Sequence, residues 1–212
     1  MIITKSKNIN NILNQINQES VFIIGCSECA TICKTGGENE ISKLEKLLIK
    51  QGINVIGSVI LEPACHKLND KRILNKYKNE LKDIKQIITL SCGNGAQTIS
   101  EIFEDKEVIS GTDTIFLGQI KHINEFEKKC NLCGNCIINK YDGLCPITRC
   151  PKNMLNGPCG GSKEGKCEID NNMDCIWHLI YKKFKKNNRV KELREINEPF
   201  DWSNSKIWRI KI

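Results

Sequence analysis

Thirteen cysteines in a chain of 212 residues constrain this sequence more than any other feature. The first residues, MIITKSKNINNILNQ, lack the apolar stretch and the small-residue cleavage site of a signal peptide. No apolar run approaches the roughly 18 residues that a membrane helix needs. We therefore expect a cytoplasmic protein with no membrane insertion. Because disulfides are disfavoured in a reducing cytoplasm, this density of thiols predicts metal binding or redox chemistry.

The charge of the chain gives little support for a nucleic-acid partner. The net charge is +7 with every cysteine counted as neutral, and metal-bound thiolates would offset much of it. Lysine is densest in residues 182–194, KKFKKNNRVKELR, which we interpret as a solvated helix face. No basic motif interleaved with aromatic residues accompanies it, so nucleic acid is not an expected partner.

Residues 1–125 alternate between strand-like and helix-like segments. This order predicts an α/β domain built on an open parallel sheet. The predicted strands are residues 21–25, 54–62, 85–91, 107–110 and 113–120, and the predicted helices are residues 8–17, 38–52, 68–82 and 95–104.

Residues 126–186 have a different texture, with eight cysteines, several glycines and prolines and few long apolar runs. We expect an irregular, cysteine-rich domain that bound metal organises, because metal binding can supply the folding free energy that a small core cannot. A helix is predicted over residues 175–186. Residues 187–212 are interpreted as a docking tail, since Trp202 and Trp208 suit a partner contact. Packing of these tryptophans against the protein's own body is the alternative.

A first group of cysteines lies at or just beyond the carboxyl ends of the predicted strands. In open α/β sheets this edge is where ligands bind. A cubane cluster needs four thiolates, and the C-x2-C-x3-C run that begins at residue 26 can supply three of them. The fourth would come from residue 65 or 92, for which burial as an apolar side chain is the alternative. The group consists of Cys26, Cys29, Cys33, Cys65 and Cys92.

A second group of eight cysteines has the number required for two sites of four. It begins with the C-x2-C-x2-C spacing of ferredoxin-type iron–sulfur sites. However, eight residues lie between the third cysteine of this run and the next cysteine, where the ferredoxin run has three. The wider gaps that follow suit zinc as well as a cluster, so the metal and the pairing stay open. His66, His122 and His178 lack a matching spacing. The cysteines are Cys130, Cys133, Cys136, Cys145, Cys150, Cys159, Cys167 and Cys175.

Several strings together resemble a known family. They are GCSECATICKTGGENE (25–40), VILEPAC (59–65), LSCGNGAQ (90–97), CNLCGNCI (130–137), DGLCPITRCPKNMLNGPCGGS (142–162) and GKCEID (165–170). The family is the small, MetV-type subunit that accompanies the flavoprotein methylenetetrahydrofolate reductase in anaerobic bacteria. The likeness spans roughly residues 21–185.

The resemblance implies an iron–sulfur electron-transfer subunit of an oxidoreductase, itself non-catalytic, in the one-carbon metabolism of the acetyl-CoA pathway. Two or three [4Fe-4S] clusters are expected, with zinc in place of one cluster in the second domain as the alternative. The flavin and folate sites would belong to the partner reductase, and a further subunit would be the electron donor. The alternative functions are a zinc-stabilised, non-redox adaptor of the same complex and an independent enzyme acting at the first cysteine group.

Overall fold

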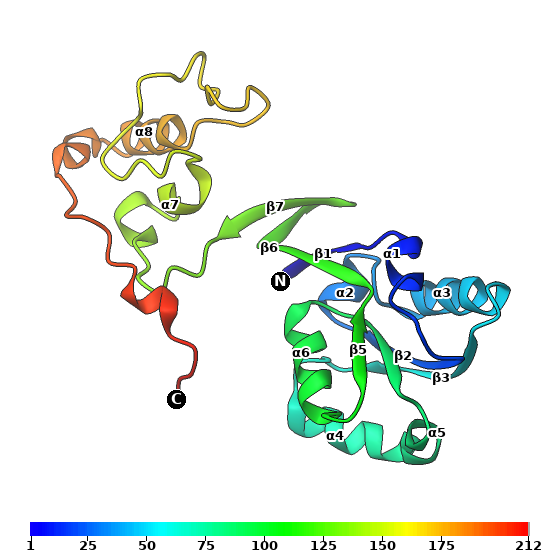
Figure 1. Cartoon of the computed structure of the whole chain (residues 1–212). Helices are drawn as coiled ribbons and strands as arrows, with labels where there is room; N and C mark the ends of the chain where they lie inside the picture. Colours follow the sequence, from blue (N-terminus) through cyan, green and yellow to red (C-terminus); the bar gives the residue numbers. More distant parts are fainter. Residues whose placement is uncertain (212) are drawn as a thin grey trace. The chain divides into compact units, whose positions relative to one another are not determined.

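The computed structural model describes residues 1–211 and divides into two compact units (Figure 1). The N-terminal unit is Met1–Phe116 and the C-terminal unit is Leu117–Ile212. The domain boundary predicted after residue 125 coincides with the first residue of a strand, β7 (Glu125–Cys130).

A four-stranded parallel sheet forms the centre of the N-terminal unit, which confirms the predicted α/β class. The strand order is β3-β2-β4-β5, and each neighbouring pair is parallel. The strands are β2 (Ser20–Cys26), β3 (Asn54–Leu61), β4 (Gln86–Leu90) and β5 (Glu107–Ser110).

Helices cover both faces of this sheet (Figure 1). Helices are present in each of the four predicted segments, but the one predicted over residues 68–82 is broken by a 3-10 turn, and the short helix α2 was not predicted. The helices are α1 (Ile9–Leu13), α2 (Cys29–Ile32), α3 (Glu38–Lys50), α4 (Lys67–Leu74), η1 (Asn75–Tyr77), α5 (Lys78–Lys82) and α6 (Gly93–Ile102).

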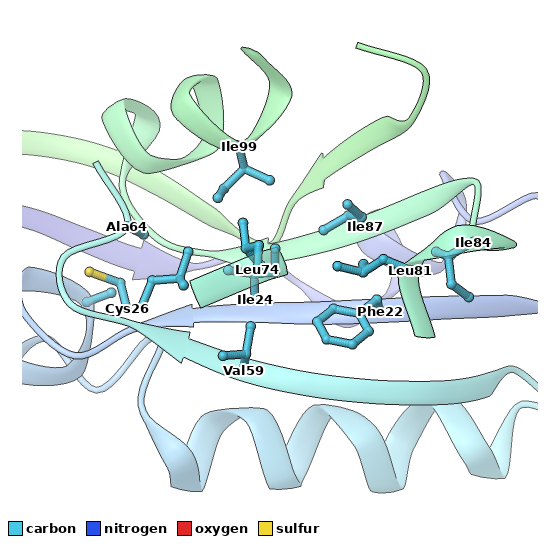
Figure 2. Close-up of a cluster of buried hydrophobic side chains, with 12 residues drawn as sticks. Phe22, Ile24, Cys26, Val59, Ala64, Leu74, Leu81, Ile84, Ile87 and Ile99 are labelled. Atoms are coloured by element: carbon cyan, nitrogen blue, oxygen red, sulfur yellow. The ribbon is translucent and has the colours of Figure 1, made fainter. Parts of the chain in front are cut away.

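Alternation along β2 divides the core into two clusters, because successive side chains of a strand point to opposite faces. Val21 and Ile23 pack with residues of α1 and α3 on one face. Phe22, Ile24 and Cys26 pack on the other face with residues of α4, α5 and α6. Figure 2 shows this second cluster, with the Cys26 sulfur at one end of it. Cys26 is therefore both a core residue and the last residue of its strand.

A second sheet has the strand order β1-β6-β7. Sequence patterns missed β1 (Ile2–Ser6) and β7, and they placed β6 (Thr112–His122) as a shorter segment. β7 pairs antiparallel with β6, so that Leu117 faces Cys130. The apolar pattern of β7 is weak because its residues, EFEKKC, are mostly charged and only half buried.

The C-terminal unit has little regular structure apart from α8 (Ile176–Lys186), which confirms the helix predicted there. Its small core consists of Tyr141, Ile176, Trp177, Ile180 and Phe184. The rings of Tyr141 and Trp177 meet edge to face at 5.4 Å between centroids. The remaining elements are η2 (Ile138–Tyr141), α7 (Pro146–Arg149), η3 (Val190–Arg194) and η4 (Ser203–Lys206).

Across residues 1–211, no helix has both the length and the apolar character that would allow it to cross a lipid bilayer.

Candidate functional site

Three cysteines of the first group come together at the carboxyl edge of the parallel sheet. In the strand register Cys26 lies beside Leu61 of β3, and its neighbour Gly25 lies beside Leu90 of β4. Cys65 follows β3 by four residues, and Cys92 follows β4 by two. Cys26 and Cys92 are buried, whereas Cys65 is exposed.

The pKa of the Cys65 thiol reflects the convergence of these strand ends. Burial raises the pKa of the Cys65 thiol, and nearby Cys92 and Cys26 raise it further. Like charges disfavour one another at short range, so thiolates nearby favour the protonated form of Cys65. A metal ion would reverse that preference, because a coordinating thiol is deprotonated outright.

A carboxylate that sequence patterns missed lies near the same edge. Asp70, on α4, is fully buried, and neither of its carboxylate oxygens has a hydrogen-bond partner. Burial raises its pKa from 3.8 to about 6, against the opposing effect of His66. Asp70 also contributes to the raised pKa of Cys65. A polar helix residue near an N-terminus looks like an ordinary surface residue in the sequence, so no sequence signal distinguishes it.

The other two cysteines of the first group face a different element. The Ile2 N–H donates to Cys29 Sγ at 3.4 Å, and the Cys33 thiol donates to the Ile2 carbonyl at 3.9 Å. Both sulfurs thus contact the main chain of β1. The C-x2-C-x3-C run is therefore divided, with Cys26 at the sheet edge near Cys65 and its companions against β1.

Four cysteines of the second group line a single small cavity in the C-terminal unit. They are Cys150, Cys159, Cys167 and Cys175. The cavity has a volume of about 20 Å³, which is room for one water-sized atom. Four thiolates around one atom is the arrangement of a closed structural zinc site.

Main-chain hydrogen bonds hold the loops that carry these four cysteines. Cys167 N donates to the carbonyl of Met173 at 2.9 Å, and Cys175 N donates to that of Gly165 at 2.8 Å. Met154 N donates to Cys150 Sγ at 3.5 Å. The loops therefore have defined partners although they contain little helix or strand.

The remaining cysteines surround the turn that ends β7. Leu132 N donates to Cys130 Sγ at 3.3 Å, in a turn that places Leu132 and Gly134 at positive φ. The chain therefore reverses direction after Cys130, and the Leu132 amide points at the Cys130 sulfur. Asn131 Nδ2 donates to the carbonyl of Ile147 in α7 at 3.1 Å, which ties the turn to the helix that Cys145 caps.

None of these thiol groups is already arranged as a complete ligand set. Among the described residues, 1–211, no three His, Cys, Asp or Glu side chains lie close enough together to hold a metal ion. The expected metal-organised domain thus has no structural support from ligand geometry, and metal binding by the thirteen cysteines stays a prediction. His66 has a structural role instead, since its Nδ1 accepts from Asn69 N at the start of α4.

Comparison with known proteins supports the family resemblance. Residues 109–203 match the family model described as methylene-tetrahydrofolate reductase C terminal. The matched part contains all eight cysteines of the second group and none of the first. No curated protein matches the chain.

Proposed function

We propose that this chain is the iron–sulfur, electron-transferring subunit of a flavin-containing methylenetetrahydrofolate reductase. The observation that carries the proposal is the C-x2-C-x2-C run of Cys130, Cys133 and Cys136, which lies in the part of the chain that matches the family model. In the same matched part, Cys150, Cys159, Cys167 and Cys175 line one small cavity. Thiols that share one cavity in a reducing compartment are suited to bind metal.

The eight cysteines of the C-terminal unit divide into two sets of four under this proposal. The cavity set would hold zinc, because its volume suits one ion. The set of Cys130, Cys133, Cys136 and Cys145 would hold an iron–sulfur cluster, because it begins with the ferredoxin-type spacing. When bound, such a cluster supplies one-electron transfer.

The protein's own groups would tune that second set. The Leu132 amide donates to Cys130 Sγ, and hydrogen bonds to the sulfurs are among the factors that set a cluster's potential. Cys130 and Cys145 are half buried, whereas Cys136 is exposed. An exposed ligand places the site near the surface, where a partner protein can exchange electrons with it.

Anaerobic co-expression with a flavoprotein methylenetetrahydrofolate reductase tests the proposal. We expect the two chains to co-purify, and the complex to contain iron, acid-labile sulfide and an EPR signal after reduction. Cys133→Ser should remove that iron and slow flavin reduction, whereas Cys159→Ser should remove zinc and leave flavin reduction unchanged. A complex without iron, or flavin reduction that is indifferent to Cys133→Ser, would contradict electron transfer.

A zinc-stabilised adaptor of the same reductase is the second candidate. The cavity favours it, because four thiols around one ion-sized space need no iron. The exposed Trp202 and Trp208 of the tail would then serve as docking anchors. Zinc without iron in a stable complex with the flavoprotein would identify this function.

A further inference from the structure

A groove in the N-terminal unit lies between two helical segments on one face of the parallel sheet. One wall is the continuous run of α4, η1 and α5, and the other is the end of α6 with the loop that follows it. α4 packs against α6, and α5 follows α4 along the chain (Figure 1). The groove has a volume of about 420 Å³, which lies in the range of about 300–1,000 Å³ for ligand-binding pockets. No cysteine is among the described residues that line it.

The floor of the groove is apolar and belongs to the core. Leu74 and Leu81 are each 3% exposed, and both are part of the core cluster shown in Figure 2. Ile102 and Phe103 are partly buried and pack against the same cluster. Because these four side chains are anchored in the core, the floor is formed before any ligand binds. A preformed apolar surface lowers the entropic cost of binding.

A row of lysines borders this apolar floor. Lys78 and Lys82 follow Lys71 by seven and eleven residues, which is the spacing of one helix face. All three are exposed, and all three line the groove although η1 interrupts the helix between the first and the second. The row is roughly 16 Å long, at about 1.5 Å per helical residue. Three cations therefore lie along one side of a single apolar groove.

The protein's own acidic side chains do not compensate for this charge. Among residues 1–211, none of them forms an ion pair with the three lysines. Of the described residues that line the groove, only Asp105 is acidic, and its carboxylate lies 3.3 Å from Lys106 Nζ. Lys106 Nζ also donates to the carbonyl of Ile84 at 2.9 Å. Glu80 is two residues from its neighbouring lysines and is therefore on the opposite side of α5.

An acidic segment of a protein fits this surface better than a small anion does. A single carboxylate or phosphate forms an ion pair only within about 4 Å, so it can reach one end of the row and not the other. Acidic side chains repeated along a peptide can reach every lysine of the row. Leu68, three residues before Lys71 on the same face of α4, is 80% exposed and extends the apolar surface beyond the groove. The complementary occupant is therefore both acidic and amphipathic.

We propose that this groove is a docking site for an acidic, amphipathic segment of a partner protein. Carboxylates of that segment pair with Lys71, Lys78 and Lys82, and an apolar side chain of it lies on Leu74 and Leu81. The groove is formed by residues 71–106, outside the part of the chain that matches the family model. The docking site goes beyond the proposed function and does not rest on it, because no cysteine and no metal takes part.

Fluorescence anisotropy of a labelled peptide, titrated with the full chain under anaerobic conditions, tests the docking site. The peptide carries leucines at helical spacing among glutamates. The double variant Lys78→Glu/Lys82→Glu should weaken binding about tenfold or more, because like charges then face the peptide. Lys46→Glu/Lys50→Glu is the matched control, since it makes the same charge change at the same spacing on exposed positions of α3. At about 0.15 M salt the control should change the affinity less than about threefold, because distant surface charges are screened.

Two further probes separate apolar contact from charge. A peptide with serine in place of leucine should bind about tenfold more weakly or worse, because it buries no apolar side chain on the floor of the groove. Dodecanoate, a small amphiphilic anion, should fail to displace the leucine peptide. Hydrogen exchange of β4 verifies that each variant is folded.

Several outcomes would overturn the proposal. Equal weakening in the two double variants, or equal affinity of the serine peptide, would show attraction to positive charge alone. Displacement by dodecanoate would assign the groove to a small amphiphile, and the absence of peptide binding would exclude a docking site of this chemistry. These measurements do not involve iron content or flavin reduction, so each of these results would leave the proposed function standing.

Discussion

Replacing Asp70 with asparagine should stabilise the folded protein at neutral pH. In the metal-free protein the carboxylate is buried without a partner, and its pKa is raised from 3.8 to about 6. The folded protein therefore binds more protons than the unfolded chain between these two values. The stability associated with neutral Asp70 is complete below pH 3.8 and is lost as the pH rises through about 6.

The magnitude follows from the two pKa values. A difference from 3.8 to about 6 corresponds to roughly 3 kcal/mol at pH 7, at about 1.4 kcal/mol for each unit. Asparagine removes the charge but leaves a buried amide without a partner, which costs about 1 kcal/mol. We therefore expect Asp70→Asn to raise the free energy of unfolding of the N-terminal unit by about 2 kcal/mol at pH 7. Near pH 4 the gain should vanish.

Hydrogen exchange measured by mass spectrometry can isolate this effect. Peptides covering β2 and β4 report the opening of the N-terminal unit alone, since these strands are its most buried segments. Chelated wild-type and variant proteins are compared at the same pH, so that intrinsic exchange rates cancel. Asp83→Asn is the matched control, because Asp83 is exposed on the same unit. Equal or lower protection in Asp70→Asn at pH 7 would refute the reasoning.

Further perturbations test the central sheet, the cysteine-rich segment and the C-terminal tail. Ile88→Ala should destabilise the N-terminal unit by about 2–5 kcal/mol in denaturant unfolding, because Ile88 is completely buried in the central sheet. Removal of metal by a chelator should make residues 130–175 sensitive to limited proteolysis and leave β2 and β4 protected. If β2 and β4 were cleaved before residues 130–175, metal would not be the main source of stability of the C-terminal unit. Asn197→Ala should speed cleavage of the tail, because it removes the side-chain Nδ2 that donates to Tyr141 Oη at 2.8 Å and to Asn156 Oδ1 at 2.9 Å. Because the Trp208 side chain is 90% exposed, Trp208→Ala should change the free energy of unfolding by no more than about 0.5 kcal/mol. The same variant should weaken binding to the flavoprotein about tenfold or more. An unchanged affinity in a binding titration would exclude Trp208 as an anchor.

Sequence patterns predicted the parts of the fold that depend on local periodicity. Apolar runs such as residues 85–91 are buried on both faces of a parallel sheet, so their strand character is visible without tertiary information. The amphipathic pattern of residues 38–52 likewise predicted α3. β1 and β7 were missed, because their half-buried or charged residues produce no strong alternation.

The sequence by itself determined that this chain is rich in thiols, that its first half is α/β, and which family its cysteine-rich strings resemble. Only the tertiary structure decided which thiols are neighbours. The C-x2-C-x3-C run suggested one loop of ligands, yet Cys26 lies at the same sheet edge as Cys65 and Cys92, and Cys29 contacts the main chain of β1. Strand order and helix packing set these distances, and spacing along the chain does not encode them. The same holds for Asp70, whose burial is a property of the packed helix and not of its sequence context.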